Sequence, residues 1–552
     1  MQNLYGFADL THPLLPSLML ENCYSHPYQG HLFSLSIDGT CFHSGEQILT
    51  AYHNLGQDFI RKENGHFAIA LWDGAKKQLL LYRDRSGVKP CFYLQDGAKL
   101  AFASLPQDLF TLTDTKPSLD EEALLELLSI GPARVPGYGL FQNVRELLPG
   151  QYLIFSPEGL QLHTYWALEA KPHEANYEDT CTHVAHLLTD AIGQQISNGP
   201  TPCSLLSGGI DSSIVTAIAS NHPAFADTPL STFSFDFAEN ATYFAPSTFQ
   251  PEQDASYIAR MLQAYPLIHT SLECPPVQLA TLLPEAIKAR NYPGMADVDA
   301  SLLFFCTKIA PSHQAALTGE CADEIFGGYP WYYKPELFQL DQFPWSWDYA
   351  SRCSFLNPEV FPQYRLEEYA HHHFTTTMRE APILPDEPED ATRHRQLTYL
   401  NLRWFMQTLL ERMDRMGRFC GVEGKVPFAD YRILEYLYNV PWEMKYKDGV
   451  EKALLRDSCK DLLPPEILHR KKSPYPKTYH PAYDTAVIQR FVQLAVDRSS
   501  PIQHLIQPSA ALDFVQNYKS MGRPWYGQLM TGIQLMAYMI QINDWLAEYH
   551  LL

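Results

Sequence analysis

Residues 207–213 read Ser-Gly-Gly-Ile-Asp-Ser-Ser and stand between the apolar run CSLL at 203–206 and the helical pattern SSIVTAIAS. The two glycines let backbone N–H groups turn toward an anion, and Ser212 and Ser213 add hydroxyl donors at the positive end of the helix dipole. The run STFSFDF at 231–237 predicts the next strand. Strand, glycine turn, helix and strand in this order are typical of a parallel α/β sheet.

Asp211 places a negative charge inside this predicted anion site. A Mg²⁺ ion that bridges Asp211 and a pyrophosphate oxygen would relieve the repulsion. A glycine-serine turn alone is weak evidence, because many such turns serve only to reverse the chain. The carboxylate in the turn therefore makes the segment a predicted site for magnesium pyrophosphate.

A second acidic and glycine-rich segment, LTGECADEIFGGY at 317–329, also follows a short apolar run. Glu320, Asp323 and Glu324 fall within one loop or first helical turn, where a cation or a proton must relieve their repulsion. One or two of them can bind metal while another acts as a base. A solvated acidic helix start is the alternative explanation.

The basic run Arg470-Lys471-Lys472 is flanked by prolines that restrict its backbone. Three adjacent cations are commonly a surface charge run. In a chain with a formal net charge of −21, a fixed cation here can instead offset charge that develops during transfer to or from AMP.

Length and composition bound the class of protein. A chain of 552 residues predicts two or three domains, and 46% hydrophobic with 19% charged residues excludes a disordered chain. The negative charge disfavours nucleic acid and anionic lipid as partners.

The N-terminus has no basic segment followed by an apolar run, and no stretch of about 18 apolar residues follows, so we predict a cytoplasmic, unprocessed chain without a membrane partner. The 11 cysteines show neither a Cys-x-x-Cys pair nor zinc-finger spacing, which predicts reduced thiols.

The chain changes its pattern near residue 170. From about residue 32 to residue 165, short apolar runs alternate with turns, and Asp73-Gly74 predicts a β-hairpin. The polar stretch HEANYEDT predicts a linker, and residues 182–196 carry the spacing of an amphipathic helix. The later chain reads as mainly helical, with a predicted surface loop at 381–394.

Four segments together resemble the synthetase part of asparagine synthetases: SGGIDSS, GECADEIFGGY, GVEGKVPFADYRILEYL and LPPEILHRKKSPYPK. The similarity covers nearly all of residues 175–490, and several motifs in the right order are more specific than any one of them. The resemblance implies an α+β and α/β fold. Residues 1–170 would form an N-terminal nucleophile (Ntn) glutaminase-like sandwich, and residues 171–552 an adenine-nucleotide alpha-hydrolase-like synthetase domain with a parallel sheet.

The resemblance also implies roles for individual residues. Glu320 matches the base that takes a proton from the attacking amine, Lys472 matches the lysine that stabilises charge, and Tyr329 completes the catalytic set. Asp211 and Asp323 match the metal-binding carboxylates, with ATP and Mg²⁺ as the implied cofactors. Pyrophosphate contacts are implied for Ser207, Gly209, Asp211 and Ser212, to which the residue types add Gly208 and Ser213, and adenine and ribose contacts for Leu205, Phe235 and Gly319.

The predicted glutaminase-like domain departs from this family. The family needs cysteine as the first residue of the mature chain, whereas Gln2 follows Met1 here. The scaffold motifs FAIALWD at 67–73 and RDRSGVKPCFY at 83–93 remain, but Arg-Gly-Pro-Asp and Asn-Gly-Glu segments are missing and Asp38-Gly39-Thr40 is the nearest remnant. We therefore expect a degenerate glutaminase-like domain and a nitrogen source other than glutamine, either ammonia or an amine.

A second departure lies at 293–304, where many asparagine synthetases carry an arginine for the substrate carboxylate. This chain has Asp297 and Asp299 there. We expect the acidic loop to face the acceptor pocket and to favour a substrate that bears an amino group. An ordinary capped helix start is the alternative.

The resulting prediction is an ATP-dependent amide ligase that joins a small-molecule or peptide carboxylate to ammonia or an amine through an acyl-adenylate, with asparagine synthesis as the leading assignment. The alternatives are a specialised-metabolism amide ligase or a macrolactam- or β-lactam-forming cyclase that resembles lasso peptide cyclases, and a non-catalytic nucleotide-binding scaffold. The sequence leaves a homodimer open.

Overall fold

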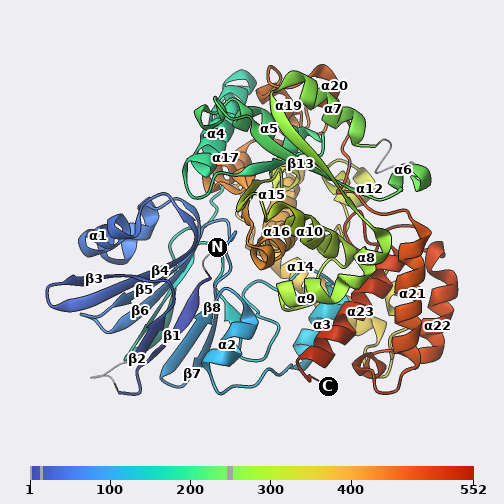
Figure 1. Ribbon diagram of the computed structural model, residues 1–552, viewed down its shortest axis with the longest axis horizontal. Helices are drawn as coiled ribbons and strands as arrows, with labels where there is room; N and C mark the ends of the chain where they lie inside the picture. The colour runs from blue at the N-terminus through green and yellow to red at the C-terminus, as the bar shows by residue number, and fades with distance from the viewer. Residues whose placement is uncertain (1–2, 13–16, 245–252, 552) are drawn as a thin grey trace. The chain divides into compact units, whose positions relative to one another are not determined.

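The structure is a computed structural model that describes residues 3–12, 17–244 and 253–551 (Figure 1). It divides into two compact units. Unit 1 comprises Met1–Ala123, Val135–Glu169 and Ala429–Tyr431, and unit 2 comprises Leu124–Arg134, Ala170–Phe428 and Arg432–Leu552. The assignment of functional domains to residues 1–170 and 171–552 stays a prediction.

The described part of unit 1 contains two antiparallel sheets, with strand orders β2-β1-β8-β7-β9 and β11-β10-β6-β5-β4-β3. The strands are β1 (Tyr5–Asp9), β2 (Ser17–Leu20), β3 (Tyr24–Tyr28), β4 (His31–Cys41), β5 (Gly65–Asp73), β6 (Gln78–Arg83), β7 (Phe92–Asp96), β8 (Lys99–Ala103), β9 (Arg145–Glu146), β10 (Gln151–Ser156) and β11 (Gly159–Thr164). The predicted hairpin at Asp73-Gly74 is confirmed, because β5 and β6 pair antiparallel across it.

Strand β5 is buried on both faces, which explains its nearly continuous apolar sequence. Successive side chains of a strand point to opposite faces. Trp72 packs in one core cluster with Phe102 of β8, while Leu71 packs in a second cluster with Leu49 of α1 (Gly45–Leu55). One cluster therefore fills the space between the two sheets, and the other lies under a helix.

Unit 2 is built around a parallel sheet with strand order β14-β13-β12-β15-β16. Its strands are β12 (Cys203–Leu205), β13 (Leu230–Phe237), β14 (Leu267–Cys274), β15 (Ala315–Leu317) and β16 (Glu423–Lys425). Helix α5 (Ile210–Ser220) connects β12 to its parallel neighbour β13. The predicted order of strand, glycine turn, helix and strand is therefore confirmed.

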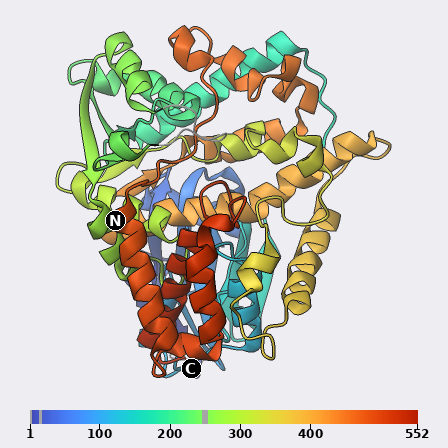
Figure 2. The same cartoon turned by 90° about the vertical axis from the view of Figure 1, so that its right-hand side faces the viewer.

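Helices make up most of the remaining described chain, and Figure 2 shows the C-terminal ones side by side. The helices are α2 (Pro106–Leu112), α3 (Glu121–Ser129), α4 (Tyr177–Ser197), α6 (Asn240–Tyr243), α7 (Ala255–Ala264), α8 (Pro276–Thr281), α9 (Leu283–Arg290), α10 (Asp297–Ile309), α11 (Ala322–Phe326), α12 (Pro335–Phe338), α13 (Tyr349–Cys353), α14 (Gln363–Glu380), α15 (Glu389–Leu400), α16 (Met406–Cys420), α17 (Tyr431–Asn439), α18 (Trp442–Lys445), α19 (Ala453–Ser458), α20 (Pro465–Leu468), α21 (Pro481–Val496), α22 (Pro508–Asn517) and α23 (Gly532–Glu548).

Two helices begin earlier than the sequence pattern predicts. Helix α4 starts inside the predicted linker, because the Asn176 side chain accepts a hydrogen bond from the Asp179 N–H at 3.0 Å and caps the helix. Helix α15 starts inside the predicted loop at 381–394, with Glu389 and Asp390 in its first turn, where carboxylates suit the helix dipole. The loop prediction is therefore wrong for residues 389–394.

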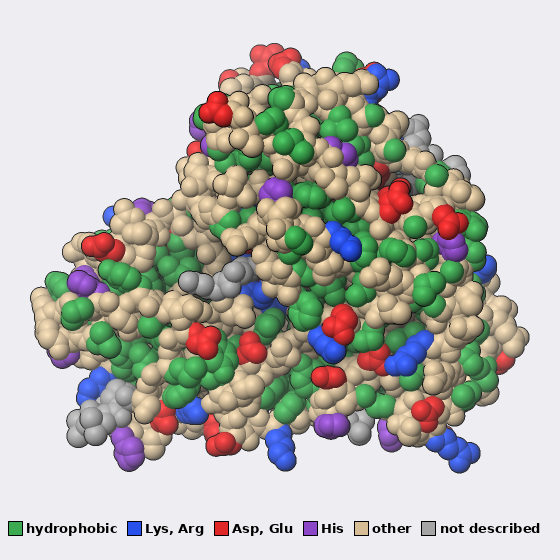
Figure 3. Space-filling view, in the orientation of Figure 1, with side chains coloured by type: hydrophobic (Ala, Val, Ile, Leu, Met, Phe, Trp, Pro, Cys, Tyr) green, Lys and Arg blue, Asp and Glu red, His purple; other side chains and the backbone are tan. Residues whose placement is uncertain are grey.

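On the face drawn in Figure 3, charged side chains are scattered among neutral and apolar surface, and Lys and Arg form no continuous patch. None of the described helices combines the length and the apolar character that a membrane span needs. All 11 cysteines are free thiols, so the prediction of unbridged cysteines is confirmed.

Candidate active site

A cavity in unit 2 lies beside the ends of β12, β13 and β15, at the carboxyl edge of the parallel sheet. Ligands of open α/β sheets bind at this edge. All predicted site residues except Gly208 and Ser213 line it: Leu205, Ser207, Gly209, Asp211, Ser212, Phe235, Gly319, Glu320, Asp323, Tyr329 and Lys472. Segments that are more than 100 residues apart in the chain are thus brought together at one place.

The N-terminus of α5 presents uncapped backbone donors at the cavity. Gly209 is the N-cap of α5, and within the described part of the chain no side chain caps the first N–H groups of that helix. The Ser212 hydroxyl lies 3.0 Å from the Ser207 hydroxyl and donates to the Gly209 carbonyl at 3.2 Å, which holds the turn in shape. An 11-residue helix with an open N-terminus is suited to bind phosphate.

Gly208 and Ser213 do not belong to the cavity wall. Gly208 has φ +68°, and a Cβ atom on it would lie 2.6 Å from the Tyr257 Cβ and 2.9 Å from the Ile258 nitrogen. Its role is to let α7 pack closely against the turn. Ser213 is fully buried and its hydroxyl has no hydrogen-bond partner among the described residues. The prediction that these two residues contact the nucleotide is therefore not supported, because the helix turns Ser213 away from the side that carries Ser212.

The second motif packs directly on the first. A Cβ atom on Gly319 would lie 2.7 Å from the Ser212 nitrogen and 2.9 Å from the Asp211 carbonyl carbon. Only glycine allows this approach, so the 317–329 segment reaches the start of α5. The approach brings Asp323 near Asp211.

One lysine that the sequence analysis missed joins the two predicted metal ligands. Lys452 Nζ lies 2.8 and 2.7 Å from the two carboxylate oxygens of Asp211 and 2.5 Å from Oδ1 of Asp323. Lys452 is buried, with 3% of its side chain exposed. No local pattern marks it, because EKALLR reads as an ordinary helix start.

The shared ammonium affects the two carboxylates differently. Burial raises the pKa of Asp211, and Lys452 offsets this only in part. Burial also acts to raise the pKa of Asp323, but Lys452 and Lys472 together hold it below its usual range. Asp323 is the more acidic of the two because it has two lysine partners, while Asp211 has one.

Two cations of the basic run, Arg470 and Lys472, have different surroundings, and only Lys472 lines the cavity. Lys472 ion-pairs with Asp323 and lies over the Tyr329 ring at 4.6 Å. Arg470 is buried, donates to the Ser207 carbonyl at 3.1 Å and lies 4.1 Å over the Tyr257 ring. Arg470 thus fixes the phosphate turn to the segment that carries Lys472.

Glu320, the predicted general base, is paired with Arg412 of α16. Burial raises the pKa of Glu320, and the guanidinium opposes this rise. Only one carboxylate oxygen is engaged, since Oε2 of Glu320 is buried without a hydrogen-bond partner among the described residues. That oxygen can accept a proton from a nucleophile that enters the cavity.

Tyr329 donates a hydrogen bond to Glu324 at 2.5 Å in the interior of unit 2. Two causes raise the pKa of Glu324 to about 7: burial is the larger, and the negative charge of the neighbouring Asp323 carboxylate is the smaller. Burial raises the pKa of Tyr329 well above its usual value, so its hydroxyl stays protonated. The ring of Tyr329 packs edge-on against Phe405 at 5.3 Å, which links the motif to the helix that carries Arg412.

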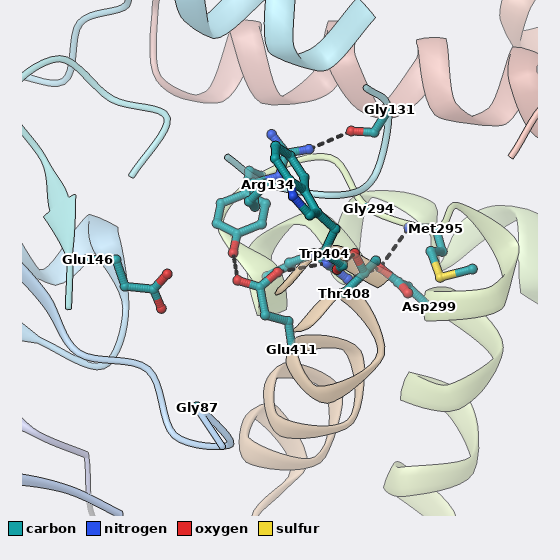
Figure 4. Close-up of polar contacts among 12 residues, drawn as sticks. Gly87, Gly131, Arg134, Glu146, Gly294, Met295, Asp299, Trp404, Thr408 and Glu411 are labelled. Atoms are coloured by element: carbon teal, nitrogen blue, oxygen red, sulfur yellow. Dashed lines mark hydrogen bonds and ion pairs between the residues drawn. The ribbon is translucent and has the colours of Figure 1, made fainter. Parts of the chain in front are cut away.

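The acidic loop does not face the cavity, contrary to the expectation from the sequence. Asp299 is buried and binds Arg290 at 2.9 Å and the Met295 N–H at 3.0 Å (Figure 4). Asp297 accepts a hydrogen bond from Gln534 at 3.1 Å, and burial raises its pKa to about 6. The two residues start α10 and are buried in the surrounding structure, so the inferred preference for an amino-bearing substrate loses its basis.

We call the part of the cavity beside Asp211, Asp323 and the N-terminus of α5 the phosphate end, and its carboxylates fit Mg²⁺ by their chemistry. Two carboxylates, Asp211 and Asp323, already share one cationic group, and hard oxygen donors are what Mg²⁺ prefers. Among the described residues, no group of three or more His, Cys, Asp or Glu could hold a metal ion. A protein that binds Mg²⁺ with two carboxylates leaves its other positions to water and substrate phosphate, as is usual for this ion.

Comparison with known proteins identifies the family. The chain matches the asparagine synthase family over residues 183–547 and the glutamine amidotransferase domain over residues 35–166. It is 38% identical to asparagine synthetase (glutamine-hydrolyzing) 3 of Bacillus subtilis (strain 168), across 95% of this chain and 84% of that protein. It is 25% identical to asparagine synthetase (glutamine-hydrolyzing) 1 of the same strain, across 78% of this chain and 70% of that protein. It is also 25% identical to amidase chyE of Penicillium rubens, across 83% of this chain and 76% of that protein.

These matches, together with the sandwich in unit 1 and the parallel sheet in unit 2, confirm the predicted fold. The chain belongs to the asparagine synthase family and is an ATP-dependent carbon–nitrogen ligase.

Proposed function

We propose that this ligase activates a carboxylic acid as an acyl-adenylate, releases pyrophosphate from ATP, and then joins the acyl group to ammonia or an amine. The observation that carries the proposal is the phosphate end of the cavity. An open helix N-terminus faces two carboxylates that share a lysine ammonium, which suits a pyrophosphate with a magnesium counter-ion. The chain also has no Gly-x-x-x-x-Gly-Lys-Ser/Thr loop of the kind that supports γ-phosphate transfer.

The first half-reaction needs the acid and the α-phosphate to meet beside Glu320. The turn at Ser207–Ser212 binds the β- and γ-phosphates, and Lys472, 4.6 Å over the Tyr329 ring, stabilises charge on the α-phosphate. When bound at Asp211 and Asp323, Mg²⁺ would neutralise pyrophosphate charge. A carboxylate oxygen of the acid attacks the α-phosphorus, and pyrophosphate leaves.

The second half-reaction uses Glu320. Its free Oε2 accepts a proton from the incoming nitrogen as that nitrogen attacks the activated carbonyl. Arg412 holds the other oxygen, so the carboxylate stays in place, and the guanidinium opposes the rise in pKa that burial causes. AMP then leaves, and its departure is assisted by the cation Lys472.

The proposed nitrogen source is ammonia or an amine. In the described residues of unit 1 the thiols are Cys23, Cys41 and Cys91. Burial raises the pKa of both Cys41 and Cys91, whereas a nucleophilic thiol needs a lowered pKa. Cys23 is exposed, and its Sγ lies 3.6 Å from the Ser25 hydroxyl, which is not a base that could activate it.

Product analysis with purified protein tests the proposal. Incubation with ATP, Mg²⁺, a panel of acids and ammonium should yield AMP and pyrophosphate in equal amounts. Appearance of ADP and phosphate would contradict the adenylate route.

A separate experiment tests the nitrogen source. Glutamine labelled with nitrogen-15 at its amide should release no glutamate, and the amide product should take its nitrogen from unlabelled ammonium or from a supplied amine. Glutamate formed at the rate of amide synthesis would overturn this part alone.

A further inference from the structure

The cavity wall beside Glu320 contains an arginine whose hydrogen-bonding capacity is only partly used. Arg412 lies on α16, lines the cavity, and has 7% of its side chain exposed. One terminal nitrogen donates to Glu320, while Nε is buried and has no hydrogen-bond partner in the described part of the chain. A guanidinium carries five N–H donors in a rigid fork, so it can hold a second acceptor while it stays paired with Glu320.

A hydroxyl in the same wall is also unsatisfied. Ser473 lines the cavity, and its Oγ is buried without a hydrogen-bond partner among the described residues. Ser473 and Tyr475 each precede a proline, and a residue in that position favours an extended backbone. The prolines thus limit the backbone freedom of the segment that presents both side chains to the cavity.

Tyr475 connects the arginine to the segment that carries the serine. The Arg412 guanidinium lies over the Tyr475 ring, 4.8 Å from its centre. The Tyr475 hydroxyl accepts a hydrogen bond from Ser301 of α10 at 3.3 Å. The guanidinium is therefore held on two sides, by the Glu320 carboxylate and by an aromatic ring. Ser473 is two residues from that ring in the chain, so its hydroxyl belongs to the same part of the cavity wall.

Another arginine of unit 2 shows that one buried guanidinium here can hold two carboxylates. The terminal nitrogens of Arg290 bind Asp299 and Glu411, each at 2.9 Å, and its side chain is fully buried. Arg412 is buried to a similar degree but pairs with one carboxylate, that of Glu320. A second carboxylate at Arg412 would give it the same coordination, and a buried donor without a partner is costly.

The two unsatisfied atoms suit a carboxylate as the ligand. A guanidinium N–H and a hydroxyl both donate, and a carboxylate has two oxygens that accept only. The hydrogen bond from the guanidinium is assisted by charge and is therefore the stronger of the two. In the proposed reaction, the carboxylate that is activated lies at the α-phosphate. The carboxylate beside Arg412 is then a different one on the same acid.

We propose that Arg412 and Ser473 bind a second carboxylate of the acid that this ligase activates, and so select acids that carry one. The inference rests on the proposed adenylate-forming function and names residues that set its substrate specificity. One carboxylate is held beside Glu320 while the other reacts with ATP. L-Aspartate is an acid of this kind.

The first test compares four acids that differ in two groups. L-Aspartate has a second carboxylate and an amine, succinate only the carboxylate, β-alanine only the amine, and propionate neither. We expect kcat/KM for pyrophosphate release to be at least about 100-fold higher for each dicarboxylic acid than for its monocarboxylic counterpart. Thermal unfolding with Mg²⁺ and an ATP analogue that has a methylene between the α- and β-phosphates measures binding without reaction. The dicarboxylic acids should give the larger rise in Tm.

Ser473→Ala removes one donor and leaves the pair of Arg412 and Glu320 intact. We expect kcat/KM for the dicarboxylic acids to fall about ten-fold, as for a lost hydrogen bond to a charged group, and their rise in Tm to shrink. Values for the monocarboxylic acids should change by no more than about two-fold. Ser213→Ala is the matched control, since its hydroxyl is also buried and unpartnered but is not part of the cavity wall. Equal losses for all four acids in Ser473→Ala would contradict the assignment.

Arg412→Lys keeps a positive charge beside Glu320 but loses the guanidinium fork. The loss in kcat/KM should be at least about ten-fold greater for the dicarboxylic than for the monocarboxylic acids. Arg403→Lys is the matched control, because Arg403 of η4 (Asn401–Phe405) also has a buried, unpartnered Nε and does not line the cavity. The control should keep the preference of the unmodified protein.

The outcomes separate the inference from the function on which it rests. Pyrophosphate release and Tm shifts that show no advantage for acids with a second carboxylate would overturn the proposed subsite and leave the adenylate route intact. ADP and phosphate as products with any acid would overturn the proposed function. Losses confined to the dicarboxylic acids in Ser473→Ala and Arg412→Lys support both.

Discussion

The two ends of the cavity in unit 2 are built in different ways. The phosphate end is dense in charge and comes from two contiguous motifs, the turn at 207–213 and the segment at 317–329, with cations added by Lys452 and Lys472. The rest of the lining is mostly apolar and comes from β12 and β13, from α10 and α16, and from a turn near residue 528. The charged part of the lining is thus set by two local motifs, whereas the apolar part is assembled from several elements of unit 2.

The largest expected effect is at the phosphate end. Asp211→Ala removes a carboxylate that contacts Lys452 and that the proposed magnesium site requires. We expect turnover to fall at least about 100-fold, as for loss of one preorganised electrostatic group. Steady-state pyrophosphate release measures it, and circular dichroism checks that the fold is retained. Turnover within a few-fold of the unmodified protein would contradict the assigned role.

Glu320→Gln should separate the two half-reactions. A general base is needed only when nitrogen attacks, so amide formation should fall about 10²- to 10⁴-fold while adenylate formation falls less. Exchange of labelled pyrophosphate into ATP reports the first half, and amide product reports the whole. Equal losses in both would mean that Glu320 acts on binding of the acid or metal.

Lys452→Met tests whether the missed lysine substitutes for a cation between two carboxylates. Removal of one partner of a buried ion pair costs about 3–5 kcal/mol of stability, so Tm should fall. Mg²⁺ alone should then restore part of that loss, because Asp211 and Asp323 are freed to bind it. Thermal unfolding with and without Mg²⁺ measures both effects.

Lys460→Met serves as the control for this variant, since Lys460 is exposed. It should leave Tm unchanged and independent of Mg²⁺. A Lys452→Met protein that gains nothing from Mg²⁺ would show that the two carboxylates do not form a metal site.

The smallest effect concerns two adjacent serines. Ser212→Ala should raise KM for ATP, because its hydroxyl faces the cavity and braces the turn. Ser213→Ala should change KM by no more than about two-fold, because the Ser213 hydroxyl is buried and unpartnered. Equal rises in KM for both variants would restore the sequence-based assignment of Ser213 to the nucleotide site.

Much of the fold and of the phosphate end was predictable from sequence because both depend on local patterns. The apolar run of β5, the Asp73-Gly74 turn and the glycines of residues 207–213 each indicate their conformation within a few residues. Local sequence indicates less clearly which way a side chain points at the start of a helix. Ser212 and Ser213 differ by one helical step, yet one lines the cavity and the other is buried in the core.

The part of the lining around Phe405 and Gly527 was not predictable because it depends on long-range packing. Phe405 and Gly527 are far apart in the chain and meet only in the folded unit. From the sequence, Asp299 was expected to face the pocket. In the structure it pairs with Arg290 of α9, and no sequence pattern indicates that pair. Lys452 was missed for the same reason, since its partners Asp211 and Asp323 lie more than 100 residues away.

In the proposed reaction, a carboxylate oxygen of the substrate attacks the α-phosphorus of ATP. A carboxylic acid labelled with oxygen-18 in its carboxylate tests this directly, with AMP and the other phosphate products analysed by mass spectrometry after a limited turnover. We expect each AMP to carry one oxygen-18 and pyrophosphate to carry none. Unlabelled AMP, or label in inorganic phosphate formed with ADP, would contradict it.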